Sequence, residues 1–313
     1  MKKKDIMLAL LTVLIWGVNF TVIKLGLSGV PSMLLVVLRY LATAFPAIFF
    51  IKKPKIEWKY IIIYGLFVGV LQFSSLFYAM ELGMPAGLAS IILQFQAFAS
   101  PAFAFIFLKE KLKAKQIIGS LVAIGGLTII AMETVSGGIS EIPILAIILT
   151  IATPVFWAAS NIIARVASDK AAANGDKLDM FGLVIWSALI PPIPILIFAL
   201  MIDTPETLIN AILNMNGMSI FAVFYLAFGA TLFGYGVWGM LVAKYPMGKV
   251  APITLLVPII GLLTANIVLH EQLSSMQWIG ASVILLGLLI TNLNFKSLIG
   301  YFNKSKVKQA ETI

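Results

Sequence analysis

Residues 60–80 read YIIIYGLFVGVLQFSSLFYAM, a run of 21 residues without Asp, Glu, Lys or Arg. A helix of about 20 apolar residues spans the hydrocarbon core of a bilayer, so this stretch predicts a membrane helix. Comparable runs recur along the chain, and the two short runs on either side of Arg39 join into one helix that contains it. The sequence thus predicts ten membrane helices, at residues 6–25, 32–51, 60–80, 86–108, 116–132, 142–163, 180–202, 219–243, 250–269 and 275–295.

The composition of the whole chain agrees with an all-α integral membrane protein. Of its 313 residues, 61% are hydrophobic and 11% are charged, and the mean hydropathy is +1.04. A soluble domain would carry about 25% charged residues to cover its surface. The composition therefore argues against soluble dehydrogenases, kinases and nucleic-acid-binding proteins, and it excludes a disordered chain.

Signals of enzymatic chemistry are absent from the sequence. The chain has no cysteine, which removes disulfides, thiolate nucleophiles and iron–sulfur clusters, and its single histidine, His270, does not make a multi-histidine metal site. The sequence also lacks the glycine-rich loop and lysine that bind the phosphates of ATP, which argues against transport driven directly by ATP hydrolysis. We expect no enzyme activity, no catalytic residue, no cofactor and no metal site.

Basic residues are concentrated on one side of the predicted membrane helices. All 22 Lys and Arg except Lys24 and Arg39 fall in the two tails or in every second loop. Positive charge gathers on the cytoplasmic side of membrane proteins, so both termini are predicted to be cytoplasmic. This topology explains the net charge of +9 without nucleic-acid binding.

The two halves of the chain resemble each other. A shift of 161 residues places residues 64–130 on residues 225–291, and a shift of 141 places Trp16 on Trp157. Five helices in each copy turn the second copy upside down, and such inverted repeats are typical of secondary transporters. The predicted units are two five-helix repeats and a basic cytoplasmic tail, at residues 1–133, 134–296 and 297–313.

Short motifs in both halves resemble a known group of transporters. Trp16-Gly17-Val18-Asn19-Phe20 followed by Lys24, and the Glu-x-Leu motifs that begin at Glu110 and Glu271, resemble the EamA type of the drug/metabolite transporter superfamily. Residues 83–90, 93–98 and 184–191 resemble the members of this family that export O-acetylserine and cysteine. The resemblance implies a bacterial inner-membrane exporter of such metabolites or of related small amino acids.

Aromatic and amide side chains inside the predicted helices are candidates for a central site. Trp16 and Trp157 each lie eight residues before a basic residue, which at 1.5 Å per residue places both near the middle of the bilayer. Asn19 and Asn161 lie on roughly the same helix faces as these tryptophans. We interpret the four as lining for a zwitterionic amino acid; the alternative is a contact between helices, with each Asn bonded across the bundle.

Arg39 is the lone charge deep inside a predicted helix. A buried guanidinium would attract a substrate carboxylate, although a pair with Glu81 or with carbonyls at a helix end is an alternative. Gln72 and Gln94 could bind substrate through their amides or could serve structural hydrogen bonds. The predicted substrate site comprises Trp16, Asn19, Arg39, Gln72, Gln94, Trp157, Asn161, Trp186, Tyr235 and Trp238.

These observations predict a secondary transporter that exports O-acetylserine, cysteine or related metabolites by alternating access around a midplane site. The expected partners are a small amino-acid metabolite and the lipid bilayer, with no nucleic acid and with homodimerisation left open. One alternative is a broader exporter of amino acids or aromatic metabolites. Another is a membrane sensor or assembly factor that binds without transport.

Overall fold

The computed structural model describes residues 1–135, 142–245 and 250–292, and these residues form helices and connecting turns without a strand. Seven helices in this part of the chain are long and apolar enough to cross a membrane, and three shorter apolar helices accompany them. The long spans are α1 (Lys3–Gly26), α3–η1–α4 (Trp58–Gly65, Leu66–Phe73, Ser74–Glu81), α5–η2–α6 (Ala86–Ile92, Leu93–Phe95, Gln96–Leu108), α7 (Ala114–Val135), α8 (Ile144–Ala173), α9 and α10 (Met180–Ser187, Pro192–Ile202) and α12–η3–α13 (Gly217–Phe224, Tyr225–Phe233, Gly234–Lys244).

The shorter helices are α2 (Ser32–Ile48), α15 (Leu256–Leu269), which follows the 3-10 turn η4 (Ala251–Leu255), and α16 (Ser275–Asn292). The all-helical, membrane-spanning class predicted above is confirmed. The arrangement of ten helices in two inverted repeats stays a prediction, and the predicted tail at residues 297–313 lies outside the described residues.

The helix predicted at residues 180–202 is interrupted in the structure. It ends at Ser187 as α9 and resumes at Pro192 as α10. Proline has no backbone N–H, so Pro191 and Pro192 cannot donate to the carbonyls of the preceding turn, and α9 ends before them. A further short helix, α11 (Pro205–Leu213), begins at a capping Thr204 in a stretch predicted to be a loop.

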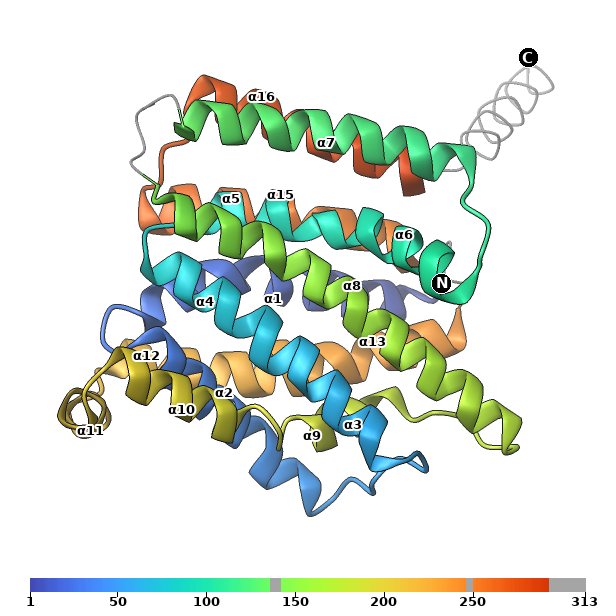
Figure 1. Ribbon diagram of the computed structural model, residues 1–313, viewed down its shortest axis with the longest axis horizontal. Coiled ribbons are helices and arrows are strands. Elements are labelled where there is room, and N and C mark those ends of the chain that lie inside the picture. Colours follow the sequence, from blue (N-terminus) through green and yellow to red (C-terminus); the bar gives the residue numbers. More distant parts are fainter. Residues whose placement is uncertain (136–141, 246–249, 293–313) are drawn as a thin grey trace.

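The helices run side by side in layers (Figure 1), with α7 and α16 together at one edge of the molecule. Glycines let these two helices approach closely. A Cβ atom built on Gly126 would lie 2.5 Å from the carbonyl oxygen of Gly280, and one on Gly287 would lie 2.6 Å from that of Gly119. Small residues permit such backbone contacts in membranes, where packing replaces the hydrophobic drive between helices.

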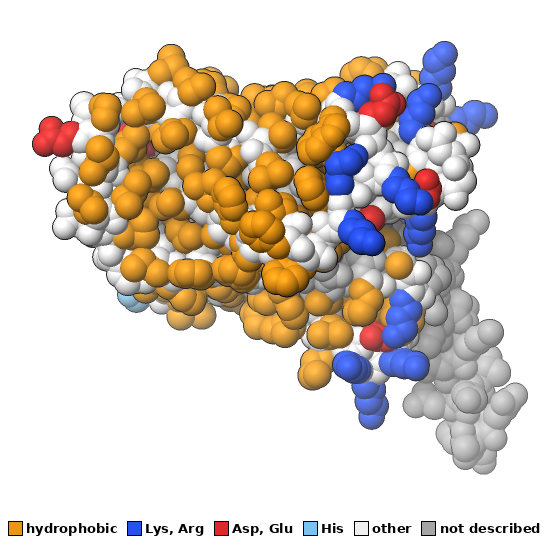
Figure 2. Space-filling model, turned by 90° about the horizontal axis from the view of Figure 1, so that it is seen from below, with side chains coloured by type: hydrophobic (Ala, Val, Ile, Leu, Met, Phe, Trp, Pro, Cys, Tyr) orange, Lys and Arg blue, Asp and Glu red, His pale blue; other side chains and the backbone are white. Residues whose placement is uncertain are grey.

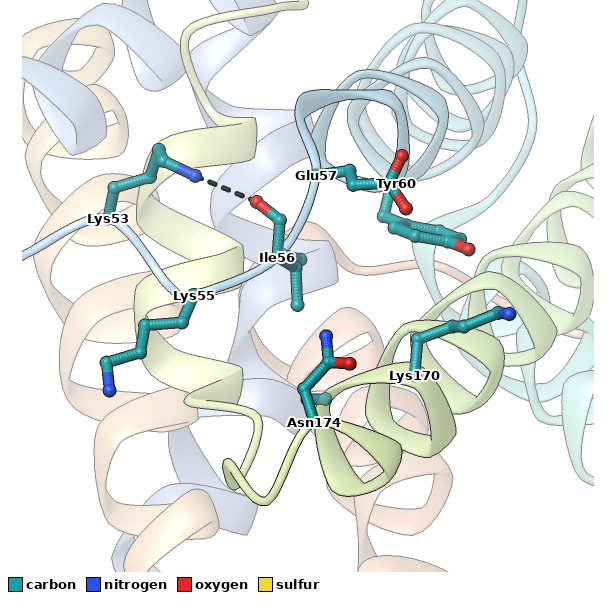
Figure 3. Close-up of a pocket in the computed structure, with 8 residues that line it drawn as sticks. Lys53, Lys55, Ile56, Glu57, Tyr60, Lys170 and Asn174 are labelled. Atoms are coloured by element: carbon teal, nitrogen blue, oxygen red, sulfur yellow. Dashed lines mark hydrogen bonds between the residues drawn. The ribbon is translucent and has the colours of Figure 1, made fainter.

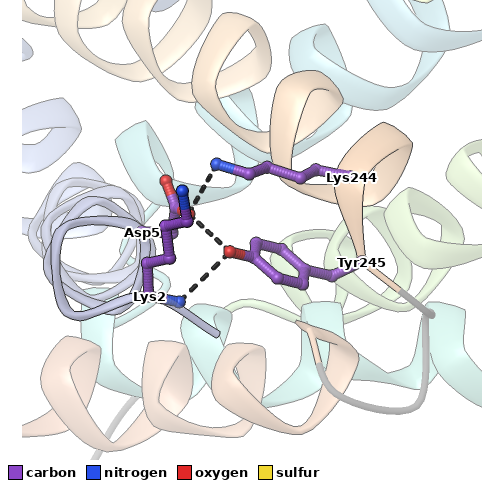
Figure 4. Close-up of polar contacts among 4 residues, drawn as sticks. All are labelled: Lys2, Asp5, Lys244 and Tyr245. Carbon is purple, nitrogen blue, oxygen red and sulfur yellow. Dashed lines mark hydrogen bonds and ion pairs between the residues drawn. The ribbon is translucent and has the colours of Figure 1, made fainter.

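Lysine and arginine side chains gather at one end of the molecule, while hydrophobic side chains cover the rest of the same face (Figure 2). Three ion pairs join segments that are distant in the sequence there, and we call this the basic end. Lys244 at the end of α13 pairs with Asp5 of α1 at 2.7 Å, Lys55 with Asp176 at 2.8 Å, and Arg165 with Glu110 at 3.8 Å. Figure 4 shows the first contact, in which Tyr245 donates a hydrogen bond to Asp5 and accepts one from the backbone N–H of Lys2.

Glutamates join helices at the opposite end. Glu81, at the end of α4, accepts hydrogen bonds from the backbone and the hydroxyl of Ser32 at the start of α2. Glu271, which follows α15, accepts from the backbone N–H groups of Ala86 and Gly87 at 2.7 and 3.0 Å. A carboxylate on the free N–H groups of a helix start is favourable because it satisfies donors and meets the positive end of the helix dipole.

The helices α6 and α15 end in the same way. Each is followed by a residue in the left-handed region, Lys109 with φ 57° and His270 with φ 55°. In both turns the next N–H, that of a glutamate, donates to a carbonyl six residues earlier, at 3.2 Å for Glu110 and 3.3 Å for Glu271. The two glutamates then differ: Glu271 binds the start of α5, whereas Glu110 is exposed beside Arg165.

Candidate functional site

The site is built around Arg39, which lies in the middle of α2 and is 3% exposed. Its Nη2 donates to the hydroxyl of Thr231 at 3.1 Å, and its guanidinium carbon lies 3.9 Å from the centre of the Phe73 ring. The Nε and Nη1 atoms are buried and have no hydrogen-bond partner in the described part of the chain. Neither alternative considered for Arg39 is present, because Glu81 binds Ser32 and the guanidinium contacts no carbonyl at a helix end.

Two stretches of π-helix flank this guanidinium, η1 on the side of Phe73 and η3 on the side of Thr231. The hydroxyl of Thr231 donates to the carbonyl of Leu226, five residues earlier, at 2.8 Å. A π-helical turn loosens the regular backbone pairing of a helix and is frequent at functional sites. The structure thus places Arg39 between the two widened turns of its neighbouring spans.

An aromatic cluster adjoins the same π-helical stretch. The indole N–H of Trp16 donates to the carbonyl of Ala230 at 2.9 Å, one residue before the threonine that holds Arg39. The Trp16 ring lies 5.6 Å from that of Tyr235 and 5.4 Å from that of Trp238, centre to centre. Trp16, Arg39, Tyr235 and Trp238, which are far apart in the sequence, therefore meet around η3.

Several buried acceptors near these elements also lack a hydrogen-bond partner within the described ranges. They are the side-chain oxygens of Asn19, Tyr40, Gln72 and Ser74. Tyr40 follows Arg39 on α2, and its ring centre lies 5.7 Å from the guanidinium carbon. Buried polar groups are normally paired, so free donors on Arg39 together with free acceptors on its neighbours indicate an environment suited to a polar ligand.

A second polar group lies between α6 and α8. The amide of Asn161 donates to the hydroxyl of Ser100 at 3.1 Å and to the side-chain oxygen of Gln96 at 3.4 Å. Asn161 therefore bonds from α8 to α6. This is the contact between helices that the sequence analysis gave as the alternative to substrate lining. Gln94 is buried in η2, two residues before Gln96, and Trp157 is half-buried against the main core.

Trp186 lies apart from the residues around η3. Its indole N–H donates to the carbonyl of Ile51 at 2.9 Å, beyond the end of α2, and its ring packs against Trp58. Ile51 follows Arg39 by 12 residues, which corresponds to about 18 Å along a helix. Trp186 thus belongs to the basic end, where tryptophans commonly mark the membrane interface.

Sequence reasoning did not select three residues that contact Arg39. Tyr40 and Phe73 directly follow the selected Arg39 and Gln72, so the neighbours of a buried polar residue were a usable signal. Thr231 carries no such signal, because a single hydroxyl inside an apolar helix usually bonds to its own backbone. Its contact with Arg39 depends on how α2 packs on η3.

The comparisons with known proteins match this architecture. The model of the EamA-like transporter family matches residues 3–132 and again residues 144–293. A probable amino-acid metabolite efflux pump of Escherichia coli (strain K12) is 41% identical over 290 residues, which cover 93% of this chain and 95% of the pump. A pump of the same description in Salmonella typhimurium is 40% identical over 296 residues, covering 95% and 97%.

More distant matches extend over similar lengths. A probable terminal-alkyne amino-acid exporter of Streptantibioticus cattleyicolor is 24% identical over 295 residues, covering 92% of this chain and 93% of the exporter. A solved crystal structure aligns with a TM-score of 0.60 at 14% identity over 93% of this chain and 96% of the other, which supports the fold alone. The two matched segments and the two relatives above 30% identity show that this chain belongs to the EamA-like transporter family.

Proposed function

We propose that this protein is a secondary transporter that exports amino-acid metabolites such as O-acetylserine and cysteine. The family match and the two efflux-pump relatives support an exporter, and the export of small amino acids follows the resemblance in residues 83–90, 93–98 and 184–191. The same proposal places the protein in a bacterial inner membrane with both termini in the cytoplasm, which the gathering of basic residues at one end supports.

The observation that carries the proposal is the buried, uncompensated charge of Arg39. Its contacts are the hydroxyl of Thr231 and the aromatic rings of Phe73, Tyr40 and Phe77, and it forms no ion pair with a described residue. A buried guanidinium is costly without an anionic partner, and it binds a carboxylate through two parallel hydrogen bonds. In the proposal the substrate carboxylate is that partner, and it accepts a hydrogen bond from either the free Nε or the free Nη1 atom, each of which forms a parallel pair with Nη2.

The neighbouring acceptors suit the other half of an amino acid. A substrate ammonium group carries only donors, and the unpartnered oxygens of Asn19, Tyr40 and Gln72 are acceptors. Trp16, Tyr235 and Trp238 provide an aromatic wall beside the charged groups. The proposed binding site also retains Gln94, Trp157 and Asn161 as lining residues. It leaves out Trp186, whose indole binds the carbonyl of Ile51 at the basic end.

Alternating access between two inverted halves is the proposed mechanism. The family model matches the chain twice, and the 161-residue shift found in the sequence places η1 on residues 227–234, which overlap most of η3. Substrate sites of such transporters lie where the repeats meet, at irregular helices near the midplane. Arg39 contacts both η1 and η3, so movement of one span against the other would act directly on the bound carboxylate.

Export from proteoliposomes loaded with labelled cysteine or O-acetylserine tests the proposal. We expect release by the wild-type protein and its loss in Arg39→Gln, whereas Arg165→Gln, an exposed arginine changed in the same way, should keep it. A pH gradient across the vesicle separates proton coupling from facilitated diffusion. Folded, inserted wild-type protein that releases neither compound would refute the substrate assignment.

The same assay addresses the alternatives. The aromatic cluster around Trp16 supports a broader range of cargo, and equal competition by aromatic amino acids would favour that broader exporter. A sensor that binds without transport would be stabilised by the ligand, as any specific ligand stabilises the folded state, and would release nothing.

A further inference from the structure

A hollow at the basic end lies far from the residues around Arg39. Its volume is about 320 Å³. It is bounded on one side by the chain that leads from α2 into α3, and on the other by the last turn of α8 (Figure 3). The residues that line it are Lys53, Lys55, Ile56, Glu57, Tyr60, Lys170, Ala171 and Asn174.

Two of the three lysines in this hollow have no anionic partner among the residues that the structure describes. The carboxylates nearby are already occupied: Asp176 binds Lys55 at 2.8 Å and raises the pKa of its ammonium group, and Glu57 binds Lys59 at 2.7 Å. The ammonium group of Lys53 donates to the neutral carbonyls of Pro54 and Ile56, which leaves one donor available and no carboxylate paired with the charge among the described residues.

Lys170 forms no ion pair with any residue in the described ranges, and its side chain is exposed. The hollow therefore carries positive charge on two opposite sides, from Lys53 and from Lys170. The start of α3 adds to it, because its first N–H groups receive no side-chain cap and form the positive end of a long span. A group that settles between them should be anionic and should accept several hydrogen bonds, as a phosphate does.

The aromatic residues around the hollow mark its depth in the membrane. Trp58 is 48% exposed, and its ring packs edge-on against Trp186 and lies 5.3 Å from the Lys53 ammonium. Tryptophan and tyrosine concentrate at the level of the lipid headgroups. Just before the lysines, Phe49 and Phe50 are 76% and 83% exposed, which suits contact with acyl chains rather than water.

We infer that this hollow binds the phosphate of one anionic lipid headgroup, between Lys53 and Lys170. A phosphate diester without a cationic head, as in phosphatidylglycerol, matches the charge, and its acyl chains would run along Phe49 and Phe50. Basic pockets between membrane helices bind lipid headgroups by this chemistry. A soluble phosphate ester shares the chemistry but gains nothing from the exposed phenylalanines.

Native mass spectrometry of the full-length protein, titrated with phosphatidylglycerol or phosphatidylcholine, tests the inference. We expect one phosphatidylglycerol molecule to be retained more strongly than phosphatidylcholine. A basic residue near an anionic lipid contributes about fivefold in affinity, so the double variant Lys53→Gln/Lys170→Gln should weaken this retention by about 25-fold. The control Lys111→Gln/Lys113→Gln removes the same charge from exposed residues outside the hollow and should change it less than about twofold.

Three outcomes would overturn the assignment. They are equal weakening in both double variants, equal retention of the two lipids, and displacement of the bound lipid by a millimolar excess of glycerol phosphate. The last would assign the hollow to a soluble phosphate ester. Should the double variant fail to fold, Lys170→Gln alone, at an exposed side chain, keeps the test open with an expected loss of about fivefold. Because the readout is lipid retention, a failure of the proposed transport function does not affect it.

Discussion

Replacing Thr231 by valine removes the hydrogen bond that holds the guanidinium of Arg39 while keeping the shape of the side chain. The bond joins Nη2 to the hydroxyl at 3.1 Å, and the two residues are 3% and 4% exposed. A hydrogen bond to a charged group contributes about 1.5–3 kcal/mol net, which corresponds to about 10- to 150-fold in an equilibrium constant. Since Nε and Nη1 already lack partners, the valine variant leaves all three nitrogens of Arg39 without a hydrogen-bond partner among the described residues.

We expect this loss to appear in substrate affinity, because Thr231 positions Arg39 and does not itself bind the carboxylate in our proposal. Initial export rates measured over a range of internal substrate concentrations should show KM raised at least about tenfold in Thr231→Val. The maximal rate should change far less. The variant Thr231→Ser keeps the hydroxyl and loses only a methyl group, so its KM should stay within about twofold of the wild type.

Two results would refute this reasoning. One is a Thr231→Val protein that folds, inserts and exports with the KM of the wild type. The other is a Thr231→Ser protein that loses as much affinity as the valine variant, which would assign the effect to packing in η3. Size-exclusion profiles and the fraction of protein inserted in vesicles establish that the compared variants are folded.

Three further substitutions are each expected to change the stability of the protein. Gly126→Ala places a Cβ atom 2.5 Å from a backbone oxygen of α16 and should lower thermal stability, whereas Gly125→Ala meets nothing within 4 Å and should not; equal melting of the two would contradict the packing of α7 on α16. Glu271→Gln keeps an acceptor on the start of α5 but removes its charge, and should cost about 0.3–1 kcal/mol in unfolding measurements; stability above that of the wild type would argue against the cap. Trp16→Phe keeps the aromatic wall but frees the carbonyl of Ala230, and should lower stability by about 1–3 kcal/mol; an unchanged unfolding curve would show that this carbonyl finds another partner.

Helix positions were largely predictable because the bilayer imposes a length of about 20 apolar residues on every span. Charge-free runs located the membrane-crossing helices, but they placed some ends badly. The helix predicted at residues 142–163 runs on to Ala173 as α8, ten residues past the predicted end. A charged residue ends an apolar run without ending a helix, and Ala-rich sequence with Lys170 continues a helix into water readily.

The widened turns were beyond sequence reasoning. Nothing in the composition of residues 66–73 or 225–233 distinguishes a π-helix from an α-helix; in the structure Arg39 contacts both stretches, and Trp16 binds the second. Such turns also change which side chains share a face. The 3-10 turn η2 does the same at Gln94, and it is the neighbouring Gln96 that meets Asn161.

Trp186 shows how the depth of a residue could have been used more strictly. The predicted span begins at residue 180 on the basic side, so Trp186 lies only about 9 Å from its start along a helix. By the same arithmetic Trp16 lies about 12 Å from its basic anchor, so Trp186 is the shallower of the two tryptophans, and in the structure its indole N–H binds the carbonyl of Ile51 beyond the end of α2. Aromatic character alone was a poor guide to the site.

The identical turns after α6 and α15 have a consequence for measurement. Glu110 and Glu271 follow the same left-handed residue conformation and make the same backbone hydrogen bond, yet one carboxylate is exposed and the other is bound to the start of a helix. Local backbone structure therefore does not decide between the two environments; only the neighbouring helices do. A spectroscopic label placed beside each glutamate would therefore report two different environments on the same local backbone. If a conformational change exposed Glu271 and buried Glu110, the two labels would respond in opposite directions.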